Sequence, residues 1–388
     1  MTYLASPVLY LLLLFRQGDA TKRILIIQTA KIGDLICSTP VFRETRKKYP
    51  EAYIAVMANS ATRELLEYNP NIDEIISVKN TDYKGFSGKL RLSNLIRKGK
   101  YDAGICLNPN IPFAIALFWS LVPIRLSVMP DFSGFTFKLA SVFFTHLEKH
   151  VRGKMVIETY MQMLRAVGIS SGNISKEVYK SKEADAKAEQ ILREIINPPS
   201  PPFIKGGLGG FSEQIDKPII GIAVSSGNKL KELGTDKIAG IINTILDNMN
   251  AHIVLVGSEQ ETKTANTVLQ AVAKRDSIIN AVGKLNLKEL PALIEKLSLF
   301  IGVDTGITYM ADALSIPLVN IAGPSDMKDQ RPTGKNALII QKSDLPCVPC
   351  SHTFKSPYYC IINTRRCVES VSPEEIYHAA KKLLSEHN

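Results

Sequence analysis

The run from Leu299 to Ser325, LFIGVDTGITYMADALSIPLVNIAGPS, constrains the fold of this chain more than any other stretch. Leu299 to Val303 is a short apolar run, typical of a strand that is buried on both faces. Thr308 to Leu314 carries apolar residues at helical spacing, and Leu318 to Ala322 resumes an apolar run of β type. The stretch therefore predicts a βαβ unit, which belongs to a parallel sheet covered by helices.

A polar turn, Asp304, Thr305 and Gly306, separates the first strand of this unit from its helix. Such a turn lies at the carboxyl edge of a parallel sheet, where the first backbone N–H groups of the helix have no partner and suit a phosphate. We expect Gly306 to let the backbone approach a ligand, Thr305 to add a hydroxyl, and Asp304 to accept from a ribose or orient the loop. The alternative is an ordinary crossover, which also needs a polar turn with a glycine.

Strands and helices alternate twice along the chain, once in each half. The predicted strands are Arg23–Gln28, Tyr53–Met57, Glu74–Val78 and Tyr101–Asn108 in the first half, and Pro218–Val224, His252–Val256, Ile278–Ile279 and Leu299–Val303 in the second. Between the halves, NPPSPPFIKGGLGGF is too rich in proline and glycine for a helix or a central strand. We predict an N-terminal extension (1–21), a first domain (22–196), a linker (197–216), a second domain (217–370) and a C-terminal helix (371–388), with the ligand cleft between the domains.

The composition is that of a globular protein with acidic partners. The chain has 388 residues, of which 45% are hydrophobic and 22% charged, which suits two domains with separate cores. Its net charge of +10 favours phosphates, nucleic acid or an anionic membrane surface as partners. Nucleic acid is the weaker choice, because aromatic residues make up 7% of the chain and show no RNA-binding pattern.

The N-terminus carries an apolar run from Val8 to Phe15. The run is too short to span a bilayer, which takes about 20 residues, and it lacks the basic leading region and cleavage site of a secretion signal. We predict a helical or disordered extension, with an anchor lying on the membrane surface as the alternative. The absence of a signal also predicts a cytoplasmic location.

Two other patterns are weak. The loop after the first strand, Thr29 to Asp34, contains glycine but lacks G-x-G-x-x-G, which disfavours a dinucleotide-dependent dehydrogenase. A helix is predicted from Phe137 to Glu148, and His146 and His150 lie four residues apart at its end. The sequence HLEKH is not a metalloprotease motif and offers no third ligand, so we do not expect metal there.

Four cysteines lie close together near the C-terminus: Cys347, Cys350, Cys360 and Cys367. Four thiols in so short a segment are compatible with a structural zinc site of four sulfur ligands. Reduced free thiols and disulfides are the alternatives, and a reducing compartment disfavours the disulfides. Cys37 and Cys106 are predicted to be small core residues.

Four motifs in order give the chain a family resemblance. They are RILIIQTAKIGDLICSTPVFRETRKKYP, the Ser225-Ser226 loop with Lys231, the Val-Gly-Ser-Glu turn ending at Glu259, and IGVDTGITYMADALSIPLVNIAGPS. With these motifs, residues 22 to 383 resemble glycosyltransferase family nine, the ADP-heptose:lipopolysaccharide heptosyltransferases. The resemblance implies an α/β fold of GT-B type, with two Rossmann-like βαβ domains whose parallel sheets face each other across a cleft. The acceptor would bind the first domain and the nucleotide-sugar donor the second.

The resemblance also implies an inverting, metal-independent transfer that requires no cofactor. Asp34 matches the family's proposed general base, with capping of its helix as the alternative role. Ser225, Ser226 and Lys231, with the Asp304 turn, match the groups that hold the diphosphate, and Glu259 matches a ribose-binding position. Lys231 as a solvated surface residue is the alternative.

Two residues depart from the family pattern. Tyr309 stands where the family usually has histidine, and Leu233 where it usually has tryptophan. A tyrosine at position 309 still donates a hydrogen bond but carries no charge at neutral pH. The departures bear on the identity of the sugar or base more than on the class of reaction.

The sequence thus predicts a glycosyltransferase that moves a heptose or related sugar from an ADP-sugar to a lipid-linked, phosphorylated lipopolysaccharide core acceptor. Such an enzyme would work in the cytoplasm, peripheral to the inner membrane, and would not bind nucleic acid. The alternatives are transfer from another nucleotide-sugar to another glycan, and a non-catalytic nucleotide- or sugar-binding protein.

Overall fold

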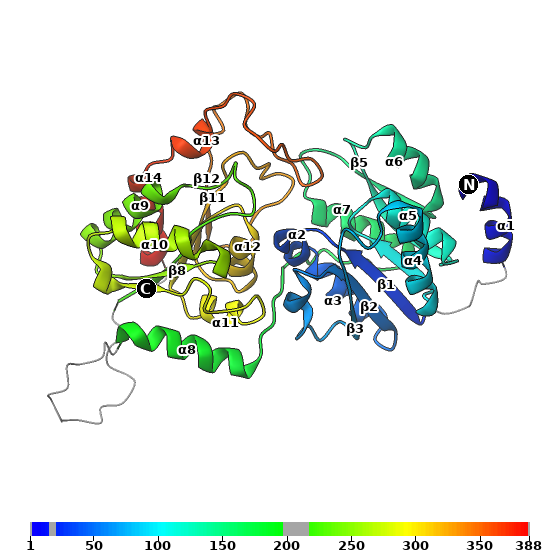
Figure 1. The fold of residues 1–388 in the computed structure, drawn as a ribbon, viewed down its shortest axis with the longest axis horizontal. Coiled ribbons are helices and arrows are strands. Elements are labelled where there is room, and N and C mark those ends of the chain that lie inside the picture. The colour runs from blue at the N-terminus through cyan, green and yellow to red at the C-terminus, as the bar shows by residue number, and fades with distance from the viewer. Residues whose placement is uncertain (1, 15–20, 197–216, 387–388) are drawn as a thin grey trace. The chain divides into compact units, whose positions relative to one another are not determined.

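The computed structural model describes residues 2–14, 21–196 and 217–386 (Figure 1). The chain divides into two compact units. Unit 1 comprises Met1–Lys176 with Lys328–Gln330 and Thr353–Lys355, and unit 2 comprises Glu177–Met327, Arg331–His352 and Ser356–Asn388. The predicted linker, 197–216, lies outside the described residues.

Unit 1 is built on a six-stranded parallel sheet with the strand order β3-β2-β1-β4-β5-β6. Its strands are β1 (Arg23–Gln28), β2 (Tyr53–Asn59), β3 (Glu74–Val78), β4 (Ala103–Cys106), β5 (Ile124–Pro130) and β6 (His146–His150). Its helices are α1 (Thr2–Leu14), α2 (Ile32–Cys37), α3 (Thr39–Lys48), α4 (Gly85–Lys98), α5 (Ile111–Trp119), α6 (Phe135–Ala140) and α7 (Val156–Met163), with 3₁₀ turns η1 (Arg63–Leu66), η2 (Ser141–Phe143) and η3 (Leu164–Val167).

Alternation along β1 explains how this sheet is covered. Leu25 and Ile27 project to the same face because side chains alternate along a strand, and both pack in one core with Leu92 and Ile96 of α4 and Leu117 of α5. The strand is buried throughout after its first residue, as the apolar run predicted.

Unit 2 has a second six-stranded parallel sheet, in the order β12-β11-β10-β7-β8-β9. Its strands are β7 (Ile219–Ala223), β8 (His252–Val256), β9 (Ile278–Asn280), β10 (Leu299–Val303), β11 (Leu318–Ile321) and β12 (Ala337–Ile340). Its helices are α8 (Lys182–Ile196), α9 (Thr235–Asn248), α10 (Thr262–Ala271), α11 (Leu290–Ile294), α12 (Gly306–Ala313), α13 (Arg366–Glu369) and α14 (Pro373–Ser385), with 3₁₀ turns η4 (Glu259–Glu261) and η5 (Arg275–Ser277).

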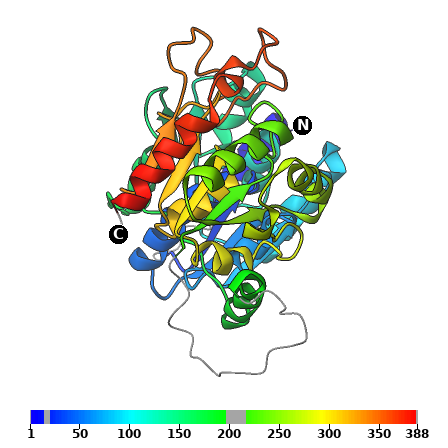
Figure 2. The ribbon, with the colours of Figure 1, turned by 90° about the vertical axis from the view of Figure 1, so that its left-hand side faces the viewer.

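The C-terminal helix α14 closes the core of unit 2. Ser372 caps it by accepting a hydrogen bond from the Glu375 backbone N–H at 3.2 Å, and Glu375 accepts in return from the Ser372 N–H at 3.0 Å, which together form a capping box. The helix packs beside α9, and its Ile376 and Ala380 are fully buried against the sheet (Figure 2).

Both sheets share a doubly wound order, in which the direction of strand succession reverses once. The reversal lies between β1 and β4 in unit 1 and between β7 and β10 in unit 2. In open α/β sheets a ligand binds outside the carboxyl ends of the strands at this switch point. The two predicted Rossmann-like α/β sheets are thus confirmed, and each has one place where a ligand site is expected.

Two details differ from the sequence predictions. The predicted helix from Phe137 to Glu148 is wrong: α6 ends at Ala140, and His146 and His150 bound the edge strand β6. The predicted first domain extends to residue 196, whereas the long N-terminal segment of unit 1 ends at Lys176. The reason is that α8 packs on α11 and β9, which belong to unit 2.

The N-terminal helix α1 has 13 residues, with a proline at Pro7. In the part of the chain that the structure describes, no helix has the length and apolar character needed to cross a membrane.

Candidate active site

A buried ion pair lies at the switch point of unit 2. The Nζ of Lys231, on the loop after β7, is 2.6 Å from Oδ2 of Asp304, the first residue after β10. The side chains are 16% and 8% exposed. The two residues meet because β7 and β10 are neighbouring strands, although they stand 73 positions apart in the sequence. Lys231 is therefore paired and largely buried, and it is not a solvated surface lysine.

Tyr309 completes a network with this pair. Its hydroxyl, on α12, donates a hydrogen bond of 2.5 Å to Oδ1 of Asp304, so both carboxylate oxygens are engaged. The ring is buried, because α12 lies tight against β10. A Cβ atom on Gly302 would stand 2.7 Å from the hydroxyl oxygen of Thr308. Tyr309 thus donates a hydrogen bond, and its acceptor is Asp304.

The loop that carries Lys231 is braced by its own side chains. Asn228 accepts from the Leu230 N–H at 3.0 Å through its side-chain oxygen, and its backbone N–H donates to the hydroxyl of Ser226 at 3.2 Å. The Lys231 N–H donates to the Asn228 carbonyl at 2.9 Å. Ser226 therefore holds the turn that directs Lys231 toward the sheet edge.

Ser225 has a partner that the sequence prediction missed. Its hydroxyl donates to Glu261, which also accepts from the Ser258 N–H at 2.5 Å. The predicted ribose ligand Glu259 is exposed at the start of η4, and its carbonyl accepts from Thr262 at 2.7 Å. The carboxylate that faces the Ser225 loop is thus Glu261, and the capping-box spacing from Ser258 to Glu261 is the signal that could have identified it.

The start of α12 adds donors beside the ion pair. Thr305 is the N-cap residue, and its side chain makes no capping hydrogen bond to the helix. Gly306 begins the helix, whose first-turn N–H groups have no carbonyl partner within it. An ammonium group, oriented by Asp304 and Tyr309, and these amides together suit a phosphate or diphosphate.

Asp34 lies at the switch point of unit 1, in the short helix α2 after β1. Its Oδ2 accepts from the Lys31 N–H at 3.3 Å, so the capping role considered from the sequence is present. Its carbonyl accepts from the Ser38 hydroxyl at 2.7 Å, and that hydroxyl accepts from the Gln28 amide at 2.8 Å. These hydrogen bonds hold α2 to the end of β1 next to Asp34.

Tyr160 is a buried neighbour of Asp34 that the sequence gave no reason to select. Burial, followed by the negative charge of Asp34, raises the pKa of Tyr160 well above its ordinary value. Its hydroxyl donates to the Leu107 carbonyl at 2.8 Å. The phenol therefore stays protonated and places a neutral polar group beside the carboxylate.

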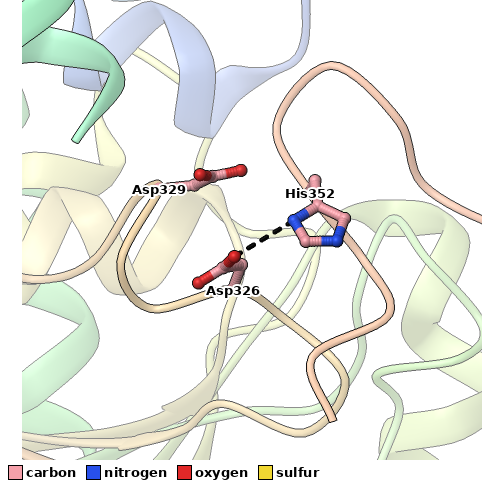
Figure 3. A group of neighbouring side chains, drawn as sticks. All are labelled: Asp326, Asp329 and His352. Carbon is pink, nitrogen blue, oxygen red and sulfur yellow. Dashed lines mark ion pairs between the residues drawn. The ribbon is translucent and has the colours of Figure 1, made fainter. Parts of the chain in front are cut away.

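Histidines pair with carboxylates in both units. In unit 1, His150 contacts the Thr159 hydroxyl at 2.9 Å, and its Nε2 is 3.5 Å from Oδ1 of Asp329. In unit 2, Nδ1 of His352 is 3.1 Å from Oδ2 of Asp326 (Figure 3). The Asp326 N–H also donates to the Ser351 carbonyl at 2.8 Å, which fastens the loop after β11 to the segment that carries the cysteines.

The four C-terminal cysteines line one pocket of unit 2. Burial, followed by the neighbouring thiols, raises the pKa of Cys350 above its ordinary value and that of Cys367 to about 11. Cys360 differs: burial raises its pKa, but hydrogen bonds from backbone N–H groups lower it further, so the net pKa is below its ordinary value. The thiols are thus close enough to influence one another, and all are free.

Comparison with known proteins gives a consistent result. The family model described as glycosyltransferase family 9 (heptosyltransferase) matches residues 89–358, more than half of the chain. Lipopolysaccharide heptosyltransferase 3 of Escherichia coli is 23% identical over 320 residues, 82% of this chain and 88% of that protein.

Two solved structures share the fold. The family 9 glycosyl transferase from Veillonella parvula has a TM-score of 0.74 at 22% identity and covers 95% of this chain and 99% of its own. The E. coli heptosyltransferase WaaC with ADP has a TM-score of 0.63 at 15% identity, covering 93% and 99%. The family model shows the family, and the two doubly wound units and the likeness to these structures show the fold. The chain therefore belongs to glycosyltransferase family 9 and is a glycosyltransferase with the GT-B fold.

Proposed function

We propose that this enzyme transfers a heptose, or a closely related sugar, from an ADP-sugar to a saccharide of the lipopolysaccharide core, with inversion and without a catalytic metal. The observation that carries the proposal is the network of Lys231, Asp304 and Tyr309 beside the first turn of α12. The relatives named lipopolysaccharide heptosyltransferases and the WaaC structure with ADP support the choice of donor and acceptor.

On the donor side, negative charge develops on the diphosphate during the reaction. As the bond from the anomeric carbon to the leaving oxygen breaks, its electron pair stays on the diphosphate, and the Lys231 ammonium and the α12 amides stabilise that charge. Asp304 and Tyr309 keep Lys231 in place before the substrate binds, so little reorganisation is needed during the reaction. In this proposal Lys231 has the role that a divalent metal plays in other transferases.

On the acceptor, Asp34 is the general base. It takes the proton of the attacking hydroxyl while the oxygen bonds to the anomeric carbon on the face opposite the diphosphate, which inverts the configuration. The bonds that hold α2 to β1 through Gln28 and Ser38 fix the position of the carboxylate. A protein that only bound nucleotide would have no use for a base there.

Unit 1 also offers a pocket suited to a saccharide. It lies at the carboxyl ends of β4 and β5, holds about 370 Å³, and is lined by Pro109, Asn110, Ile111, Pro112, Pro130, Phe132, Ser133, Phe137 and Phe354. The guanidinium carbon of Arg152 lies 4.0 Å from the centre of the Phe132 ring, which brings a cation to the aromatic wall. An aromatic wall and a nearby cation suit a sugar that carries phosphate.

Titration with nucleotides tests the donor class. We expect ADP to bind more tightly than UDP or NAD, with an affinity that is unchanged by chelator, because protein cations hold the diphosphate. Isothermal titration calorimetry measures the three affinities. A preference for UDP would favour the alternative, a transferase for another nucleotide-sugar, which the Tyr309 and Leu233 departures leave open. Absence of nucleotide binding would contradict the proposal.

We also propose that unit 1 contacts the membrane surface. Leu11 of α1 is 55% exposed and Phe135 of α6 is 75% exposed. Helix α1 is linked to η2, the turn that directly follows α6, since the Tyr10 hydroxyl donates to the Val142 carbonyl at 3.3 Å. Exposed apolar side chains on a protein of positive net charge favour adsorption to an anionic bilayer.

Vesicle sedimentation tests this contact. The wild type is expected to sediment with vesicles containing anionic lipid, and Leu11→Asp with Phe135→Asp is expected to reduce the bound fraction several-fold. Tyr358→Asp is the matched control, because Tyr358 is a 96% exposed aromatic residue of unit 2. Equal sedimentation of the double variant and the wild type would refute the contact.

A further inference from the structure

Four of the six cysteines of the chain converge on one pocket of unit 2, outside the network around Lys231. Cys347, Cys350, Cys360 and Cys367 line a small pocket of about 20 Å³ that is partly open to solvent. The other walls are mainly aliphatic: Leu230, Pro324, Val348, Ile361 and Ile362. Nothing in the proposed transfer reaction uses these thiols.

Backbone contacts hold three of the cysteines against the core. The N–H groups of Cys350 and Ser351 both donate to the Pro324 carbonyl, at 3.0 and 2.9 Å, which fixes the Cys347–Cys350 loop at the end of β11. Cys367, on α13, is 8% exposed and packs in the core of unit 2. The pocket is therefore part of the folded unit.

The fourth cysteine, Cys360, opens a tight turn. The Asn363 N–H donates to the Cys360 carbonyl at 3.1 Å, and Asn363 and Arg365 have positive φ angles of 53° and 45°. The turn lies on the pocket that the other three cysteines line.

We propose that Cys347, Cys350, Cys360 and Cys367 bind a metal centre as four thiolates. Four sulfur ligands select zinc or an iron–sulfur cluster among biological metals. The aliphatic walls limit access of water, and Arg365 and Arg366 line the same pocket, where their charges offset the charge of about −2 of a divalent ion with four thiolates.

The spacing of the sulfurs indicates what binding requires. Among the described residues, no three cysteine sulfurs lie within 4.8 Å of one another. Sulfurs that share one tetrahedral zinc ion stand about 3.8 Å apart. Binding of a single zinc ion would therefore require the thiols to move closer together.

The metal centre would stabilise the loop that carries Lys231. Leu230, which precedes Lys231, is one wall of the pocket. Arg365 donates to the Glu232 carbonyl, and the Asn228 amide donates to the Ser356 hydroxyl at 3.2 Å. Metal binding thus stabilises the segment against which the Lys231 loop packs. This consequence for donor binding rests on the proposed function, but the presence of the centre does not.

The test is the metal content of the full chain, purified without oxygen or chelator and assayed by inductively coupled plasma mass spectrometry together with acid-labile sulfide. Either about one zinc per chain, or iron with equivalent sulfide and visible charge-transfer absorption, supports the centre and identifies it. Cys350→Ser with Cys360→Ser is expected to lose the metal. Cys106→Ser is the control, because its sulfur contacts the Asn108 carbonyl in unit 1.

A second measurement covers a variant that fails to fold. Chelator is expected to lower the melting temperature of the wild type by several degrees, and the added metal is expected to restore it. Wild-type protein that binds neither zinc nor iron after anaerobic reconstitution would overturn the proposal. So would two disulfides among the four cysteines, or equal metal content in the wild type and the folded Cys350→Ser, Cys360→Ser variant. Metal content and melting temperature are measured without nucleotide. They therefore test the metal centre even if the proposed function is wrong.

Discussion

Replacing Asp34 by Asn is expected to lower the rate of sugar transfer about 10³-fold and to leave ADP affinity within about twofold of the wild type. The amide keeps the size of the side chain and can still accept a hydrogen bond from the Lys31 N–H, but it cannot take up the proton of the acceptor. The donor groups belong to unit 2 and are unchanged. Initial rates of transfer and calorimetric ADP affinity measure the two effects.

A matched control separates catalysis from helix capping. Asp82, in the turn before α4, accepts from the Lys79 N–H at 2.7 Å, three residues earlier, which is the same backbone contact that Asp34 makes with Lys31. Asp82→Asn should therefore transfer sugar at the wild-type rate. Wild-type turnover by Asp34→Asn, or an equal loss in both variants, would show that Asp34 is a structural cap and not the base.

Replacing Lys231 by Ala is expected to weaken ADP binding at least about 100-fold and to destabilise the fold by about 3 kcal/mol. The first effect follows from losing a charge-assisted contact to the diphosphate. The second follows because the buried carboxylate of Asp304 loses its cation and keeps only the Tyr309 hydroxyl. Calorimetry and chemical denaturation measure the two quantities.

The two effects can be separated with further variants. Lys231→Ala combined with Asp304→Asn removes the unpaired charge, so stability should recover while ADP binding stays weak. Tyr309→Phe keeps the ion pair and should cost only about 1 kcal/mol. Lys229→Ala is the control, since Lys229 lies two positions away and is exposed. ADP binding by Lys231→Ala at wild-type strength would exclude the proposed role of this lysine.

The sequence predicted the central strands of both sheets because their apolar runs are continuous. It missed β5, where Arg125 interrupts the pattern. Arg125 is nonetheless buried, since its guanidinium donates to the carbonyls of Val122, Pro123 and Phe143 at 2.5 to 2.9 Å. Burial lowers its pKa to about 10. A cation satisfied by backbone carbonyls outside its own strand cannot be recognised from local sequence.

Two edge strands, β6 and β12, were missed for a different reason. β6 reads HLEKH and has one neighbour, so part of its surface stays in contact with water and its polar residues carry no strand signal. β12, the other missed edge strand, is half-exposed in the same way.

The candidate site was predictable as a set of residues but not as a set of contacts. The motifs singled out Lys231, Asp304 and Tyr309, yet none of them showed that Asp304 pairs with the other two. The pairing with Lys231 depends on β7 and β10 being neighbouring strands. Glu261 and Tyr160 were missed because each lies distant in sequence from the residue it accompanies, Ser225 and Asp34 respectively.

The most direct test of the account is a transfer assay with ADP-heptose and a truncated lipopolysaccharide core acceptor, followed by mass spectrometry of the acceptor. The account predicts an acceptor heavier by one heptose residue, formed in the presence of chelator and not formed by Asp34→Asn. An acceptor left unmodified by folded wild-type protein would contradict the account. So would product formed from a UDP-sugar but not from ADP-heptose.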